Sequence, residues 1–245
     1  MNIVNQEYWN SSYENLDLQI VSSEDDVRKF IEQNVHVRNN GGGSCFEIGV
    51  YPGRYLAVFG ELGYQLNGVD QNKLVETKLP EWLKQSGYNV GFFKQEIIEE
   101  FCSNQKFDVV YSIGFIEHFE NYQEVILKHL EFMAENGTLF ISVPNFKGVI
   151  QHILHLLVDR ENLNRHILES MDPSEWAKLL SSNGLEVKDF GYFGNFDFWV
   201  DNQPRNIFQR ILLKCIFKAL PILKKILRKN SAIYSPYCYI LAKKV

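Results

Sequence analysis

The chain has 245 residues, of which 45% are hydrophobic and 22% charged, a composition that suits one α/β domain with an accessory segment. Its net charge of −5 gives no general reason to expect a nucleic-acid partner. The four cysteines are far apart and form no CxxC pair or Cys/His cluster, so we expect neither a disulfide framework nor a metal site.

The first few residues after Met1 contain neither a basic nor a long apolar stretch, so we expect no secretory signal. No run of ~18 apolar residues occurs, so no membrane-spanning helix is expected either. Together with free cysteines, these features predict a cytoplasmic protein. The sequence does not indicate its oligomeric state.

The first predicted element is an amphipathic helix over residues 24–35, which is followed by a loop at 39–43. From there on, short apolar runs alternate with helical patterns. Strands are predicted at residues 44–48, 64–69, 89–93, 107–112 and 137–143. Helices are predicted at residues 54–62, 74–86 and 122–133. This alternation with short connections predicts a parallel sheet covered by helices on both faces.

The end of the chain departs from that alternation. Residues 185–193 and 237–243 are strand-like, but the segment 200–232 between them is rich in basic and large apolar residues. The stretch 205–229 contains eight lysines and arginines and no acid, and Pro221 would kink or divide a helix there. Such a basic amphipathic helix either caps a substrate pocket, lies on an anionic membrane or contacts a partner protein.

A glycine-containing turn follows the strand at 44–48. Gly49 and Gly53 allow the backbone to approach a ligand closely, although glycines at such turns also occur for steric reasons alone. About 20 residues later, the next strand ends in Asp70, which can accept hydrogen bonds from a ribose diol or, alternatively, cap a helix. The pattern predicts a nucleoside cofactor. Its spacing differs from the G-x-G-x-x-G fingerprint, which disfavours a NAD-binding oxidoreductase.

Between about residues 44 and 190 the chain resembles the class I methyltransferases that use S-adenosylmethionine (SAM). Glu47, Gly49 and Gly53 match the family's first motif, whose acid orders the loop and reaches toward the methionine end of SAM. Tyr51 stands where many members carry a further glycine, which leaves less room beside the cofactor.

Three further stretches carry the resemblance. Asp70, followed by Gln71, matches the acid after the second strand. Residues 107–119 (FDVVYSIGFIEHF) are similar to the fourth strand and its turn, and residues 130–145 to the fifth strand. The order and spacing of these motifs indicate the methyltransferase fold.

The resemblance implies further contacts to SAM. Glu96 takes the place of the acid that binds the adenine amino group, with Ile97 beside the ring, although Glu96 could also be a solvated surface acid. The fourth strand, including Ser112, supplies backbone near the methionine part, and Gly114 permits close approach.

A hydroxyl acceptor also needs a base to take its proton. His118 is the first candidate because it follows the fourth strand at the carboxyl edge of the sheet, and His166 is the second. Either histidine could instead be a packing residue. Trp9 and Tyr13 lie where relatives often have a lid helix over the cofactor.

These observations predict a Rossmann-like, doubly wound α/β fold with a mainly parallel seven-stranded sheet, an antiparallel last strand and helices on both faces. We expect a lid at 1–36, the SAM-binding core at 37–200, the basic helical insertion at 201–232 and the final strand at 233–245.

The predicted function is SAM-dependent methylation of a small-molecule or glycan acceptor, with oxygen favoured over nitrogen as the methylated atom. The alternative is a protein that binds SAM without catalysis, because Tyr51 leaves less room beside the cofactor than the usual glycine. Peripheral membrane contact through 205–229 would suit a lipid-linked sugar acceptor.

Overall fold

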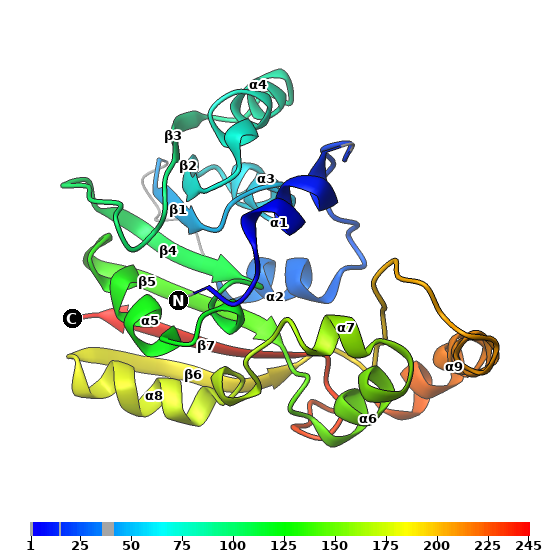
Figure 1. Cartoon of the computed structure of the whole chain (residues 1–245). Helices are drawn as coiled ribbons and strands as arrows, with labels where there is room; N and C mark the ends of the chain where they lie inside the picture. The colour runs from blue at the N-terminus through cyan, green and yellow to red at the C-terminus, as the bar shows by residue number, and fades with distance from the viewer. Residues whose placement is uncertain (1, 15, 36–41) are drawn as a thin grey trace.

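A seven-stranded sheet organises the computed structural model, which describes residues 2–14, 16–35 and 42–245 (Figure 1). The strand order is β3-β2-β1-β4-β5-β7-β6, and β7 runs antiparallel to both of its neighbours. The predicted fold is confirmed. The strands are β1 (Ser44–Ile48), β2 (Gln65–Asp70), β3 (Val90–Gln95), β4 (Phe107–Ile113), β5 (Met133–Pro144), β6 (Leu185–Phe193) and β7 (Tyr237–Lys244).

Helices and short turns connect the strands. The helices are α1 (Gln6–Tyr13), α2 (Asp26–Asn34), α3 (Leu56–Glu61), α4 (Lys78–Gln85), α5 (Tyr122–Leu130), α6 (Val149–Val158), α7 (Arg160–Leu163), α8 (Pro173–Ser182) and α9 (Ile207–Ile226). Single 3₁₀ turns occur at η1 (Lys73–Val75), η2 (Ile116–His118) and η3 (Leu168–Ser170). Within the described part of the chain, none of these helices combines the length and the apolar character needed to cross a bilayer.

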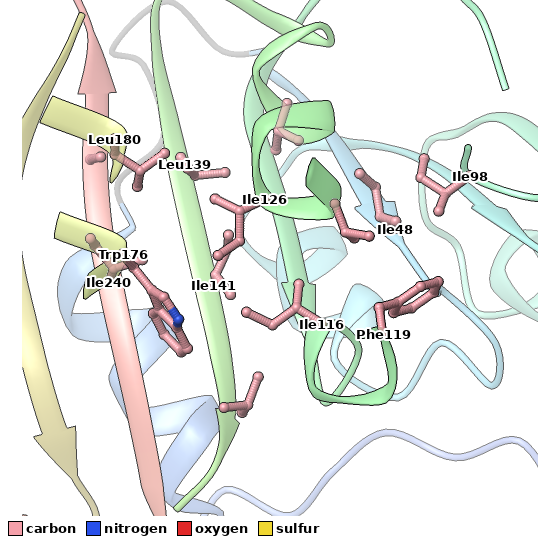
Figure 2. Packing of buried hydrophobic residues seen from close by; sticks show 14 of the residues in the cluster. Ile48, Ile98, Ile116, Phe119, Ile126, Leu139, Ile141, Trp176, Leu180 and Ile240 are labelled. Carbon is pink, nitrogen blue, oxygen red and sulfur yellow. The ribbon is translucent and has the colours of Figure 1, made fainter. Parts of the chain in front are cut away.

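The period of two along each strand divides the core between the faces of the sheet. On β5, Leu139 and Ile141 pack with α5 and α8, whereas Phe140 between them packs with α2 and α3. Figure 2 shows the first of these layers, with Trp176 of α8 close to Ile240 of β7. Both faces are therefore buried, which explains why the strands are continuous apolar runs in the sequence.

Helix α8 shows how a local sequence signal sets one of these elements. The Asp172 carboxylate accepts a hydrogen bond from the backbone N–H of Ser174, and Pro173 occupies the first turn, where its missing N–H costs nothing. Trp176 is buried, and its indole N–H donates to the Ser170 carbonyl at 2.8 Å. Trp176 is therefore a core residue of a capped helix.

The structure differs from the predicted boundaries in three places. The helix expected at 74–86 is divided into η1 and α4, and β5 begins at Met133, where a helix was expected to end. Irregular pairing at the start of β5, with Asn136 at φ 59°, explains why no alternating pattern marked this part. Helix α9 continues through Pro221, so the proline does not divide it. Residues 36–41, including most of the loop expected at 39–43, lie outside the described residues.

We expect the aromatic cluster beneath β1 to be a main source of stability. Phe46 is fully buried and packs against the rings of Phe107 and Phe132 at centroid distances of 4.7 and 5.1 Å. Phe46→Ala should lower the free energy of unfolding by about 3–5 kcal/mol, measured by urea denaturation. Phe190→Ala is the control, since Phe190 is 45% exposed and its loss should lower the free energy of unfolding much less. Equal losses in the two variants would contradict the assignment.

Candidate active site

Two adjoining cavities lie at the carboxyl ends of β1, β2 and β4, where the turns after these parallel strands meet. The first cavity is bounded by α1 and the turns after β1 and β2, and it holds about 610 Å³ of empty space including its mouth. The second lies toward β5 and β7 and holds about 960 Å³ on the same basis. Gly49, Tyr51, Gly114 and His118 line both, so the two cavities lie side by side.

The structure brings most of the predicted site residues to these cavities. Those that line at least one cavity are Glu47, Gly49, Tyr51, Gly53, Asp70, Gln71, Glu96, Gly114, His118 and His166. Ile97 is 40% exposed and lines neither, whereas its neighbour Ile98 lines the first cavity. Ser112 is fully buried, and its hydroxyl contacts Nε2 of His129 at 2.9 Å.

The turn after β1 can be built only with glycine at position 49. Gly49 has φ +74°, and a Cβ atom there would meet the Phe115 ring at 2.2 Å. Both its conformation and the space around it therefore exclude a larger side chain. The bare backbone forms the point at which the two cavities join.

Asp70 ends β2 and faces this turn. Its Oδ2 accepts a hydrogen bond from the Tyr51 backbone N–H at 2.9 Å, and its Oδ1 accepts one from the Asn72 N–H at 2.8 Å. These bonds orient the carboxylate and leave acceptor capacity toward the first cavity. Burial raises the pKa of Asp70 to about 6, although the backbone N–H groups act in the opposite direction.

Glu47 lies on β1 directly before the turn and lines the second cavity. The Tyr111 hydroxyl donates to its Oε2 at 3.0 Å. Burial raises the pKa of Glu47 well above its usual range, and the hydrogen bond from Tyr111 only partly offsets this. Arg54 lines the same cavity and supplies a positive charge there.

Helix α1 forms part of the first cavity through Trp9 and Tyr13. The Trp9 ring contacts the His118 ring edge-on at 5.0 Å, and Tyr13 contacts Tyr51 at 5.6 Å. The preceding segment is also tied down, because the Ile3 N–H donates to the His118 carbonyl at 2.8 Å. Trp9 and Tyr13 thus lie in the wall of the first cavity, and their action as a lid stays a prediction.

Glu117, His118 and His166 meet in the wall of the second cavity. Nδ1 of His118 lies 2.8 Å from the Arg165 carbonyl oxygen, and Nδ1 of His166 lies 2.7 Å from that of Asn162. Burial lowers the pKa of His118 to about 4 and that of His166 to about 3. Burial also raises the pKa of Glu117 to about 8.

Sequence reasoning missed several residues of the second cavity. Trp199 and Tyr237, whose rings stack at 5.5 Å, line it together with Ser142. They come from the segment after β6, the start of β7 and the end of β5, so no local motif joins them. Asn72 of the first cavity could have been found, because it follows the strand-end acid by two residues.

The sheet order, the glycine turn after β1 and the acid at the end of β2 together define the class I methyltransferase fold. The chain belongs to the Methyltransferase domain family, whose model matches residues 23–189, more than half of its length. It therefore carries a SAM-dependent methyltransferase domain, as the motifs predicted. The residues present fit the cofactor, since a bare turn and an oriented carboxylate adjoin the first cavity.

Individual relatives are distant. A ubiquinone biosynthesis O-methyltransferase of Rickettsia canadensis is 28% identical over 149 residues, which cover 58% of this chain and 62% of that protein. A SAM-dependent methyltransferase from Archaeoglobus fulgidus has a TM-score of 0.57 at 19% identity, covering 98% of this chain and 100% of that one. The magnesium protoporphyrin IX methyltransferase of Synechocystis PCC 6803, solved with bound SAH (S-adenosylhomocysteine), has a TM-score of 0.54 at 12% identity, covering 89% and 80%. These structures share the fold.

We expect SAM affinity to depend on the ionisation of Asp70. The ionised carboxylate predominates above pH 6 and is lost as the pH falls through 6. Its hydrogen bonds from the ribose hydroxyls therefore weaken on acidification. The Kd of SAM measured by calorimetry should rise about tenfold between pH 7 and pH 5. Asp70→Asn should bind SAM more weakly at pH 7 and lose this pH dependence. A variant with the same affinity and pH profile as the wild type would exclude the role.

Proposed function

We propose that this methyltransferase acts on a hydroxyl oxygen of a small-molecule or glycan acceptor bound in the second cavity. The observation that carries the proposal is the convergence of His118 and His166 on that cavity, beside the glycine turn. The O-methyltransferase activity in the name of the Rickettsia relative supports oxygen as the target atom. The stacked rings of Trp199 and Tyr237 suit a flat or sugar-like acceptor.

The residues around the first cavity have assignable parts in holding the cofactor. Asp70 would accept hydrogen bonds from the ribose hydroxyls, and Gln71 and Glu96 would lie beside the adenosine part. Ile98 would supply the apolar contact that the resemblance to the family had assigned to Ile97. In the second cavity, Glu47 and Arg54 contact the amino acid part. SAM supplies a methyl group already activated on a sulfonium, so the protein mainly has to orient the acceptor and exclude water.

The two histidines orient the acceptor hydroxyl. The partners of both Nδ1 atoms are carbonyl oxygens, which only accept hydrogen bonds, so each Nδ1 carries the ring proton. Each Nε2 is then left as an acceptor toward the cavity. A hydroxyl group that donates to His118 Nε2 has its oxygen lone pairs free for attack. The low pKa of His118 makes it a weak base, so positioning is its main contribution.

Helix α9 provides a second part of the proposal, a contact with anionic membrane. The helix packs on α6 through Ile216 and partly buried leucines, and none of its residues in the described chain lines either cavity. Its apolar residues left exposed are Ile207, Phe208, Ile211, Phe217, Ile222 and Ile226. Helix α6 exposes Val149, Ile153, Leu156 and Leu157 beside it. The absence of acids from 205–229 makes this surface complementary to anionic lipid, which would bring a lipid-linked acceptor to the enzyme.

The acceptor step is tested with His118→Ala. With methyl-labelled SAM and a panel of hydroxylated acceptors, the wild type should transfer label to oxygen, located by mass spectrometry. The variant should lose at least tenfold in kcat, because the acceptor is no longer oriented. His152→Ala is the matched control, since this histidine lies on α6 and lines neither cavity. Unchanged kcat in His118→Ala, or label found on nitrogen, would refute the proposal.

The membrane contact is tested by co-sedimentation with phosphatidylcholine vesicles with and without phosphatidylglycerol. We expect binding only to the anionic vesicles, weakened by salt. Lys214→Glu/Lys218→Glu should reduce binding at least tenfold, since each lysine near an anionic surface contributes about 1 kcal/mol. Lys84→Glu/Lys178→Glu makes the same charge change on α4 and α8 and should bind like the wild type. Equal binding to neutral vesicles, or no effect of the α9 substitutions, would contradict the contact.

A further inference from the structure

Glu117, His118 and His166 come together in the wall of the second cavity, and each offers a potential ligand atom. Glu117 is 1% exposed, and neither of its carboxylate oxygens has a hydrogen-bond partner. Its Oε1 lies 3.8 Å from Nε2 of His118, too far for a hydrogen bond. One atom each from Glu117, His118 and His166 lies within 4.8 Å of the others, and among the described residues this is the only such group.

The surrounding backbone fixes which histidine nitrogens are left free to bind a ligand. Because each Nδ1–H donates to a carbonyl oxygen, the Nε2 atoms of His118 and His166 are both unprotonated acceptors. This arrangement is typical of metal-binding histidines, whose second nitrogen is held by a backbone carbonyl. Two imidazole nitrogens and a carboxylate form a set of ligands used for catalytic divalent ions.

A buried carboxylate beside two other acceptors is unfavourable unless it takes up a proton or a cation lies among the three groups. We propose that Glu117, His118 and His166 bind a divalent ion of the first transition row, such as Mn²⁺ or Zn²⁺. Ligand atoms about 2.1 Å from one ion are at most about 4.2 Å apart, so small side-chain rotations complete the set. The proposal departs from the sequence expectation of no metal site, since His166 is remote from Glu117 in the chain.

The side of the ligand set that faces the second cavity leaves coordination positions open. Resting on the proposed function, an ion held there takes the place of the direct hydrogen bond from the acceptor hydroxyl to His118 Nε2, because that nitrogen has a single lone pair. The ion adjoins the hydroxyl and lowers its pKa. The hydroxyl then releases its proton to solvent. Its oxygen forms the new bond to the methyl carbon, and the electron pair of the broken C–S bond stays on sulfur, leaving neutral S-adenosylhomocysteine. Charge and atoms balance without an oxidant or reductant.

Metal binding is tested directly on tag-free protein, by calorimetric titration with MnCl₂ or ZnCl₂ and by elemental analysis after dialysis. The wild type should bind one equivalent. Glu117→Gln keeps the shape of the side chain but removes a charged ligand, and His166→Ala removes a neutral one. Both variants should weaken metal binding at least tenfold while SAH affinity, the measure of correct folding, stays within about twofold.

Glu161→Gln and His152→Ala are the matched controls, since neither residue belongs to the ligand group. They should bind metal like the wild type. Saturable binding that is lost in Glu117→Gln supports the site even if no acceptor oxygen is methylated, in which case only the proposed function fails. The metal proposal is overturned if wild-type protein that binds SAH has no saturable metal site, or if Glu117→Gln binds the ion as tightly as the wild type.

Discussion

The parallel pairing of β1 with β2 and β4 is the constraint on which the rest of the site depends. Parallel strands finish at the same edge of the sheet, so three turns from distant parts of the sequence meet there. The turn after β1 must come close to a ligand, and Gly49 is the residue that allows this. Asp70 then joins the turns after β1 and β2, because its carboxylate accepts hydrogen bonds from the backbone N–H groups of Tyr51 and Asn72.

In the proposed function, the two cavities divide cofactor and acceptor between them. The first is lined by α1, whose aromatic residues contact His118 and Tyr51. The second is lined by groups that accept protons and by stacked rings, which suit a hydroxylated acceptor. Burial favours the uncharged form of all three groups here, because it lowers the pKa of both histidines and raises the pKa of Glu117.

Tyr51 was the position at which the match to the family's first motif was weakest. Its backbone N–H donates to Asp70, an interaction that does not depend on the side chain. Its ring is 4% exposed and lies between the two cavities against Tyr13. The side chain therefore forms part of the wall instead of blocking the turn. A larger residue is tolerated there because the close approach is made at Gly49.

Much of this protein follows from sequence alone, because strand patterns, the glycine turn and Asp70 depend on neighbours a few residues away. The motif order identified the family and cofactor for the same reason. The tertiary structure decided what depends on long-range packing: His166 beside Glu117, Trp199 against Tyr237, and Ile98 in place of Ile97 in the cavity wall. It also decided which side of α9 is buried, since a helical pattern gives two candidate faces and only the position of α6 selects one.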